Sequence, residues 1–265
     1  MEVASFSLPA RAGLESEDAL AVGDGVVVVV DGAGLPKAMR SGCRHSVAWY
    51  ARVLAEAFRE RLEDAGTAMS DALADTIAHV TAAHAHTCDL DAGSPSATVA
   101  AWRLTGDEVE HLVLCDASIV LIARDGTARE ITDARVDAAA QRGAAYILGD
   151  GPHTDEQIAA ARFAALDAAR NTAGGFWCCH TDPDAAQHAL TGRTALTDLA
   201  AIVAASDGGT RGFQLLGAHS IEEFARLASA RLLDEIAAAI RAAEGGTDLR
   251  LTKRHDDITL AVASF

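Results

Sequence analysis

The run of five valines at positions 26–30, which leads directly into Asp31 and Gly32, constrains the fold more than any other stretch of the sequence. β-Branched side chains without polar alternation predict a strand that is buried on both faces. An ionised carboxylate at the buried end of such a strand is destabilising by several kcal/mol unless it is paired or ligates a metal. Asp31 therefore needs a partner from elsewhere in the chain, although Asp-Gly is also typical of a turn in which the carboxylate caps backbone N–H groups.

The composition predicts a globular protein with a large core. Half of the 265 residues are hydrophobic, and no internal repeat, low-complexity tract or linker divides the chain. We therefore expect one domain over residues 1–265, with β-sheets covered by helices. Neither a run of about 18 apolar residues nor a signal-peptide pattern is present, so we expect no membrane span and a cytoplasmic location.

The net charge of −16 restricts the partners of the chain. An acidic surface disfavours nonspecific binding to nucleic acid or to an anionic membrane, because both carry charge of the same sign. Lysine occurs only twice while arginine and alanine are frequent, a bias that we associate with high-GC bacterial genomes. The composition carries no signal of the oligomeric state.

The cysteines form an odd set of five without C-x-x-C spacing. This pattern argues against a disulfide framework and against a structural zinc site. We expect free thiols, mostly buried, at Cys43, Cys88, Cys115, Cys178 and Cys179.

Hydrophobic periodicity predicts two helices early in the chain, over residues 44–62 and 68–86, each with one buried face. Short apolar runs separated by tight-turn residues come next. They predict an antiparallel meander with strands at 97–104, 108–115, 118–123 and 128–132.

The second half of the chain is less regular. Residues 133–195 combine helical character at 155–169 with a strand pattern at 176–180. The remaining elements are a buried strand at 199–206, one long amphipathic helix at 220–242 and a closing strand in "ITLAVASF".

Aspartates stand at the ends of these buried strands: Asp31, Asp116, Asp207, and Asp256 beside Asp257. Carboxylates that converge need a counter-charge, and Mg²⁺ or Mn²⁺ suits a set of oxygen ligands without His or Cys. Two such ions about 3.5–4 Å apart activate a bridging water and hold a phosphate for in-line attack. Each aspartate could instead cap a turn or a helix start, but together they predict a metal site.

The motifs of the first third resemble those of the metal-dependent serine/threonine protein phosphatases of type 2C. "SEDAL" is similar to the N-terminal acidic motif of that family and contains Asp18. "VVDGAG" resembles the metal-bridging motif, in which the aspartate and the following glycine correspond to Asp31 and Gly32. "SPSATVAAW" is similar to the Gly-Ser/Thr-Thr-Ala strand.

The resemblance continues almost to the end of the chain. "LCDAS" followed by "ARDG" is similar to the Gly-Asp-Ser hairpin and contains Asp116, although Cys replaces the usual Gly and the hairpin is one residue longer than in many bacterial members. "AASDGGTRG" resembles the Ser-Asp-Gly motif and contains Asp207, and "RHDDITLAV" resembles Asp-Asn-x-Thr/Ser and contains Asp256.

The resemblance implies an α+β fold, a four-layer α/β/β/α sandwich of two mainly antiparallel sheets flanked by helices. It also implies two Mn²⁺ or Mg²⁺ ions at one edge. Asp31 would bridge both ions, Asp207 and Asp256 would complete the first, and the carbonyl of Gly32 would belong to the second.

Two further aspartates have weaker implied roles: Asp18 acts through bound water and Asp116 belongs to a third metal. The implied reaction is direct attack of metal-activated water on phosphoserine or phosphothreonine in a phosphorylated protein, without a phosphoenzyme. The metals and bound waters would carry most of the charge stabilisation.

Besides the altered hairpin, two features depart from the family pattern. The arginine that usually clamps the substrate phosphate, five residues before the aspartate of the acidic motif, is replaced by Gly13, and the nearest arginine is Arg11. Residues 133–195 do not match the common flap region. His255, which adjoins Asp256, is the strongest general-acid candidate among the histidines.

These departures leave two alternatives to a phosphoprotein phosphatase. One is a phosphatase-like binding or regulatory module with weak turnover, which the loss of the arginine at position 13 favours. The other is a small-molecule phosphomonoesterase built on the same scaffold.

Overall fold

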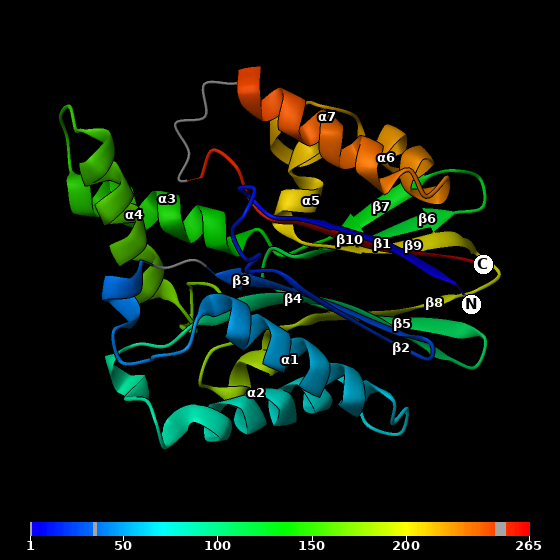
Figure 1. The fold of residues 1–265 in the computed structure, drawn as a ribbon, viewed down its shortest axis with the longest axis horizontal. Coiled ribbons are helices and arrows are strands. Elements are labelled where there is room, and N and C mark those ends of the chain that lie inside the picture. Colours follow the sequence, from blue (N-terminus) through cyan, green and yellow to red (C-terminus); the bar gives the residue numbers. More distant parts are fainter. Residues whose placement is uncertain (1, 34–35, 247–252) are drawn as a thin grey trace.

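The protein is a four-layer sandwich in which two five-stranded antiparallel sheets lie between two layers of helices (Figure 1). The structure, a computed structural model, describes residues 2–33, 36–246 and 253–265. The predicted fold class is confirmed. Within the described residues, no helix is long and apolar enough to cross a membrane.

The first sheet has the order β2-β3-β4-β5-β8. Helices α1 (Val47–Leu62) and α2 (Met69–Ala85) cover its outer face, as the helical periodicity predicted. Its strands are β2 (Ala19–Gly23), β3 (Val26–Ala33), β4 (Ser96–Thr105), β5 (Glu108–Leu114) and β8 (Leu190–Ala195).

The second sheet has the order β1-β10-β9-β6-β7. Helices α6 (Ile221–Ser229) and α7 (Leu233–Gly246) pack on its outer face. Its strands are β1 (Val3–Leu8), β10 (Ile258–Ser264), β9 (Leu199–Ala205), β6 (Ser118–Ala123) and β7 (Ala128–Ile131).

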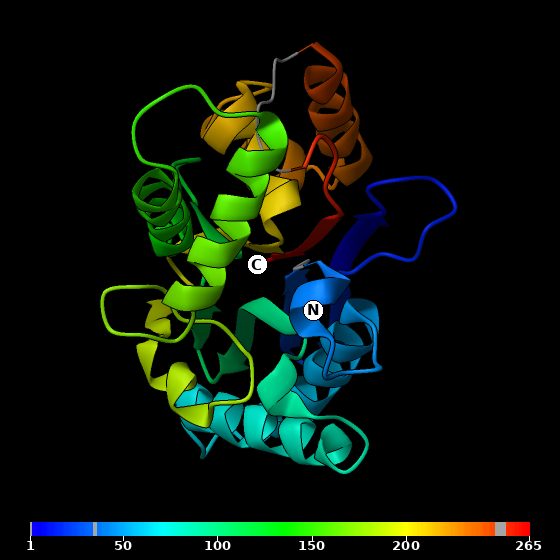
Figure 2. The same ribbon diagram turned by 90° about the vertical axis from the view of Figure 1, so that its left-hand side faces the viewer.

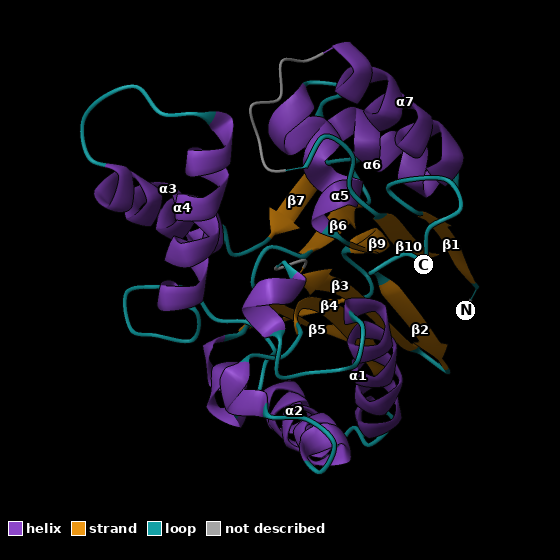
Figure 3. Ribbon diagram, turned by 60° about the vertical axis from the view of Figure 1, so that its left-hand side comes forward, coloured by secondary structure: helices purple, strands orange, loops and turns teal. Residues whose placement is uncertain are grey.

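The remaining helices gather at one end of the sandwich. Helices α3 (Arg135–Leu148) and α4 (Asp155–Ala169) pack across each other and form a pair that stands apart from the sheets (Figure 3). The end-on view in Figure 2 shows this pair on the viewer's side of the sheet ends. Shorter helical segments are α5 (Asp207–Arg211), a π-helical turn at Gly212–Leu216 and 3-10 turns at Lys37–Arg40, Leu90–Ala92 and Pro183–His188.

The valine run is buried on both faces, as predicted. Val26, Val28 and Val30 belong to the core under α1 and α2, whereas Val27 and Val29 face the second sheet. Successive side chains of a strand point to opposite faces, so an uninterrupted apolar run is what two covered faces require.

Strand β3 does not end at Asp31. It continues through Gly32 to Ala33, and Asp31 pairs with Thr98 of β4. The alternative in which Asp31 caps a turn is therefore wrong, and the carboxylate is a buried side chain within a sheet, 9% exposed.

The four strands of the predicted meander belong to two sheets. Strands β4 and β5 pair in the first sheet and β6 and β7 in the second, so the chain changes sheets at Cys115–Ala117. Cys115 adopts a left-handed conformation with φ of 69°, which turns the chain away from β5.

The long helix predicted at 220–242 is interrupted. Arg231 has φ of 61°, and the Leu232 N–H donates to the carbonyl of Leu227 at 3.0 Å while the Arg231 N–H donates to Ala228. These two bonds form a Schellman motif, which ends α6 before α7 begins. The periodicity continues across the break, so the sequence pattern alone does not reveal it.

Strands β1, β2 and β8 were not predicted, and the strand expected at 176–180 is replaced by isolated bridges at Phe176 and Cys179. Strands β1, β2 and β8 lie at sheet edges. An edge strand with an exposed face carries short or polar sequence, so its hydrophobic signal is weak.

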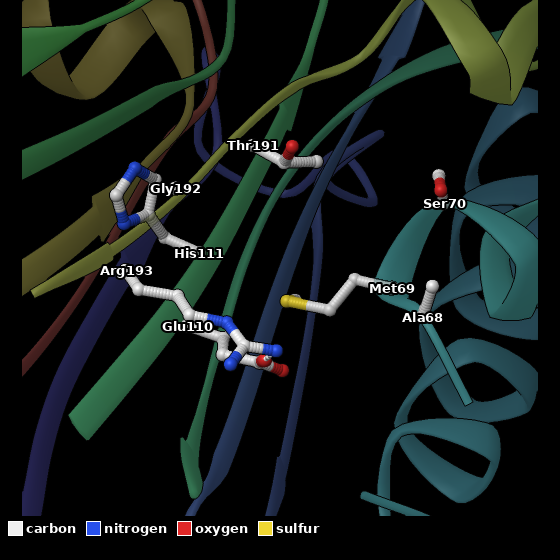
Figure 4. Close-up of a pocket in the computed structure, with 8 residues that line it drawn as sticks. All are labelled: Ala68, Met69, Ser70, Glu110, His111, Thr191, Gly192 and Arg193. Atoms are coloured by element: carbon white, nitrogen blue, oxygen red, sulfur yellow. Dashed lines mark ion pairs between the residues drawn. The ribbon is translucent and has the colours of Figure 1, made fainter. Parts of the chain in front are cut away.

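A buried ion pair joins the first sheet to the loop between α1 and α2. The Arg103 Nε donates to Glu110 at 2.6 Å, and the other guanidinium nitrogens donate to the carbonyls of Asp64 and Thr67 at 2.9 and 2.8 Å. Glu110 also pairs with Arg193 beside a cavity of about 220 Å³, which Figure 4 shows between β5, β8 and the start of α2.

We expect Arg103→Ala to lower the free energy of unfolding by about 3–5 kcal/mol, because it leaves Glu110 and two carbonyls buried with fewer donors. Urea unfolding followed by circular dichroism measures the change. Arg193→Ala is the control, since that side chain is 64% exposed and its loss should cost less than about 1 kcal/mol. Equal effects of the two variants would contradict this account.

Candidate metal centre

Five of the predicted site residues line a single cavity of about 400 Å³. They come from distant parts of the chain and from both sheets. Asp31 and Gly32 lie on β3, Asp116 in the connection from β5 to β6, Asp207 at the start of α5 and Asp256 just before β10. The structure therefore brings these residues together at one end of the sandwich.

The connection between Asp31 and Asp207 crosses from one sheet to the other. The backbone N–H of Asp207 donates to Asp31 Oδ2 at 3.4 Å. The preceding residue, Ser206, is fully buried and exchanges hydrogen bonds with Thr259 of β10: its N–H donates to the Thr259 carbonyl, and its Oγ accepts from the Thr259 N–H, both at 3.0 Å. These bonds fix the start of α5 against the neighbouring strand.

Two glycines allow the backbones around the cavity to approach closely. A Cβ on Gly32 would lie 2.5 Å from the carbonyl oxygen of Glu17, and a Cβ on Gly208 would lie 1.9 Å from the carbonyl oxygen of Asp257. Any larger residue would push these segments apart. The glycines that follow Asp31 and Asp207 therefore have a packing role beside any role as ligands.

The two adjacent aspartates before β10 have different environments. Asp257 accepts hydrogen bonds from the backbone N–H groups of Ala10 and Glu17 at 2.6 and 2.7 Å, so it holds the loop that leads to Asp18. Asp256 lines the cavity and accepts a hydrogen bond from Lys253 Nζ at 2.8 Å.

Asp18 lies behind the cavity rather than on its wall. Its carboxylate is 8% exposed, and its Oδ2 has no hydrogen-bond partner within the described part of the chain. Burial raises the pKa of Asp18 to about 8, the hydroxyls of Ser206 and Thr259 counter this shift, and repulsion from Asp257 adds to it. An unpartnered buried carboxylate oxygen is what a nearby cation or its bound water would satisfy.

The pKa values of the other carboxyl groups in the cavity are raised as well. Burial, followed by repulsion from Asp207, raises the pKa of Asp116 to about 8, that of Asp256 to about 6 and that of Asp31 well above its usual range. The predicted ligand side chains are all carboxylates, whose oxygens Mn²⁺ and Mg²⁺ prefer. The residues present therefore fit a centre of hard divalent cations.

Sequence reasoning missed four charged residues of this cavity: Lys253, Asp137, Arg162 and Arg170. Burial lowers the pKa of Lys253, but attraction from Asp256, Asp31 and other carboxylates outweighs it, so the pKa is raised and the ammonium stays charged. In the sequence, only the rarity of lysine could have drawn attention to Lys253. Asp137 and Arg162 belong to α3 and α4, where no motif pointed to them.

The predicted phosphate-binding residue lies outside the main cavity. Arg11 is exposed and lines a neighbouring pocket of about 260 Å³, which shares Lys253 and Asp256 with the cavity. Gly13 has φ of 82°, and nothing lies within 4 Å of its Cβ position. The loop thus turns at the position where the family usually carries its arginine.

The side chain of His255 is engaged away from the aspartates. His255 Nδ1 lies 2.6 Å from Glu244 Oε2, in a buried ion-pair network that includes Arg211. The expectation that His255 serves as a general acid therefore receives no support from its contacts. Cys178 and Cys179 are buried, as expected, and Cys178 lines the same cavity as the aspartates.

Comparison with known proteins identifies the family and the fold. A family model described as "Protein phosphatase 2C" matches residues 10–244. The Mycobacterium tuberculosis serine/threonine phosphatase PstP/Ppp aligns with a TM-score of 0.61 at 17% identity, covering 100% of this chain and 98% of that chain. The search against curated proteins gives no match.

Two further structures are similar at the level of the fold. The catalytic domain of the serine/threonine protein phosphatase PstP in complex with two manganese ions gives a TM-score of 0.58 at 16% identity, over 99% of this chain and 97% of that chain. Stp1 from Staphylococcus aureus gives 0.58 at 12% identity, over 100% and 94%.

We expect the metal-free protein to lose stability as the pH rises from about 4 to 8. A carboxyl whose pKa is raised in the fold keeps a proton that the unfolded chain releases, so its contribution is complete below the unfolded pKa and is lost as pH rises through the folded value. Asp256 and Asp116 span this window, with pKa values of about 6 and 8.

Urea unfolding at pH 5, 6.5 and 8, in EDTA and in saturating Mn²⁺, measures this dependence. Mn²⁺ should offset the decline at pH 8, because a bound cation favours the ionised carboxylates. Metal-free stability that stays constant or increases over this range would contradict the electrostatic account.

Proposed function

The chain belongs to the protein phosphatase 2C family and is a metal-dependent serine/threonine protein phosphatase, and we propose that the aspartates of the described cavity form its catalytic centre. The observation that carries this proposal is the convergence of Asp31, Asp207 and Asp256, from three separate segments, on one buried cavity. We further propose that residues 1–265 act as one domain.

We assign the ligands as follows. Asp31 would hold both ions, Asp207 and Asp256 the first, and the Gly32 carbonyl the second. The unpartnered oxygen of Asp18 supports a role through bound water. When bound, Mn²⁺ or Mg²⁺ supplies an activated water and neutralises charge on the phosphate.

Asp116 would serve a third ion. Burial, followed by repulsion from Asp207 and from Asp137, raises the pKa of its carboxyl, so an added cation would relieve repulsion there. This part of the centre borders α3, whose Asp137 lines the cavity beside it.

Cationic side chains of the protein would balance the negative charge of the substrate. A phosphomonoester dianion entering this cavity meets several carboxylates, so it needs positive charge beyond the metals. Lys253 already pairs with Asp256. Arg162 lines the wall formed by α4, and its Nε is buried without a hydrogen-bond partner within the described residues.

We assign phosphate recognition to Arg162, assisted by Arg11 from the adjoining pocket. A guanidinium on α4 offers the charge-assisted hydrogen bonds that Gly13 cannot supply. The substrate is then a phosphoserine or phosphothreonine side chain of another protein, bound between the metal centre and the pair α3 and α4.

The cellular setting that we propose is the cytoplasm of a bacterium. The cysteines within the described residues are free thiols, as is usual in a reducing compartment. Neither the binding module nor the small-molecule phosphomonoesterase is favoured, since the family is established and the aspartate set is present.

We expect Asp31→Asn to abolish Mn²⁺-dependent hydrolysis of p-nitrophenyl phosphate and of phosphopeptides, lowering kcat by at least about 10³-fold, because one ligand group would hold both ions. Asp24→Asn is a matched control. Asp24 is exposed in the β2–β3 turn, at the other end of β3 from the cavity, so this variant should keep full activity. Full activity of folded Asp31→Asn would refute the proposed centre.

We expect Arg162→Ala to raise KM for a phosphopeptide by about 10–100-fold, since a hydrogen bond to a charged group is worth about 1.5–3 kcal/mol. Arg162→Lys should recover part of the loss by restoring the charge. Steady-state kinetics at saturating Mn²⁺ compare both with Arg11→Ala, for which we expect a smaller effect. A larger effect at Arg11 would transfer the main role to that residue.

A further inference from the structure

Two cysteines and a histidine form a compact cluster outside the aspartate cavity. Cys43 Sγ and Cys88 Sγ lie 3.4 Å apart. His45 Nδ1 lies 3.5 Å from the first sulfur and 3.4 Å from the second. The cluster was not foreseen from sequence, because two of the donors come from one loop and the third from a loop 43 residues further along the chain.

The backbone holds the two loops together independently of these side chains. The Gly42 N–H donates to the carbonyl of Ala92 at 3.1 Å, and the Asp89 N–H donates to the carbonyl of Gly42 at 2.9 Å. A Cβ on Gly42 would lie 1.8 Å from the Asp89 carbonyl oxygen, so only glycine allows this approach. Cys43 directly follows Gly42, and Cys88 directly precedes Asp89. The paired backbones therefore fix the positions of both cysteines.

The distances match those around a tetrahedral zinc ion. With Zn–S of about 2.3 Å and Zn–N of about 2.0–2.1 Å, neighbouring sulfurs are about 3.8 Å apart and sulfur and nitrogen about 3.6 Å apart. The three observed separations lie close to these values. A single thiol–imidazole hydrogen bond would bring two of the atoms together, whereas here all three are in mutual contact.

The imidazole ring of His45 is held in place by its neighbours. It stacks on Trp49 with a centroid distance of 4.0 Å and meets the ring of His84 edge-on at 5.6 Å. The His84 Nδ1 lies 2.6 Å from the carbonyl of Val80, so it carries the proton and leaves a lone pair on Nε2. That buried Nε2 has no partner within the described residues.

We propose that Cys43, His45 and Cys88 bind one zinc ion, at a site separate from the aspartate centre. Thiolate and imidazole donors select zinc over the hard Mn²⁺ and Mg²⁺ ions that suit carboxylates. The two sites would therefore bind different metals, because the chemistry of their ligands differs.

The position of the cluster gives the ion a structural role. The first loop follows the end of β3, which carries Asp31, and the second precedes β4, whose Ser96 and Thr98 line the aspartate cavity. Figure 1 shows both loops at the same end of the sheets as α3 and α4. A metal that joins them would hold together the chain segments that flank two strands of the catalytic end.

Cobalt substitution of the full-length, reduced protein tests the proposal. Thiolate ligands give Co²⁺ an intense charge-transfer absorption that carboxylate ligands do not, so this band reports the new site alone. We expect one equivalent of Co²⁺ to produce the band in the wild type and in Asp31→Asn, and one equivalent of Zn²⁺ to displace it. Absence of the band in the folded, reduced wild type would overturn the proposal.

Variants separate ligands from neighbours. His45→Gln should weaken Zn²⁺ binding by more than about 100-fold, beyond the 10–100-fold typical of an outer-shell partner. His86→Gln, an exposed histidine of the second loop, is the matched control and should bind normally. If Cys43→Ser fails to fold, Cys88→Ser, at a less buried position, should still remove the band. Equal affinity of His45→Gln and wild type would overturn the assignment, as would recovery of a Cys43–Cys88 disulfide from protein purified without oxygen.

Discussion

Mutual repulsion between buried carboxylates is the constraint on which the architecture of this phosphatase depends. Asp31, Asp116 and Asp256 share a cavity with Asp207, and each has a raised pKa because burial and neighbouring charge both disfavour its ionised form. Lys253 supplies part of the counter-charge through its ion pair with Asp256. Without metal, the carboxylates repel one another and the fold is destabilised. Bound divalent cations remove this repulsion, and the free energy that is gained contributes to metal affinity.

The carboxylates stay close together despite their repulsion because backbone contacts fix the segments that carry them. Gly32 packs against the Glu17 carbonyl, and Gly208 against the Asp257 carbonyl, so the acidic segments cannot move apart without breaking close contacts between strands. Ser206 adds hydrogen bonds from the start of α5 to β10. The two sheets thus hold the acidic segments in fixed positions, and the carboxylates lie at one end of the sheets.

The sequence predicted what depends on strong local patterns. The valine run and the ordered aspartate motifs identified the buried strand and the candidate ligands, because burial on both faces and charge at a strand end are both visible in one short segment. It did not predict the change of sheet at Cys115 or the break at Arg231, which depend on single residues with positive φ. Contacts between segments far apart, such as Arg162 with the cavity, leave no periodic signal to read.

The proposed metal ligands and the proposed phosphate-binding cations have different structural origins, and this separation would account for the departures from the family pattern. The ligands lie on strand ends locked by glycine contacts, where a substitution would disturb two sheets at once. Arg162 lies on α4, in a helical pair that stands apart from the sheets (Figure 3). If Arg162 binds the phosphate as we propose, recognition from α4 would replace the arginine that Gly13 lacks, without a change in the backbone that holds the aspartates.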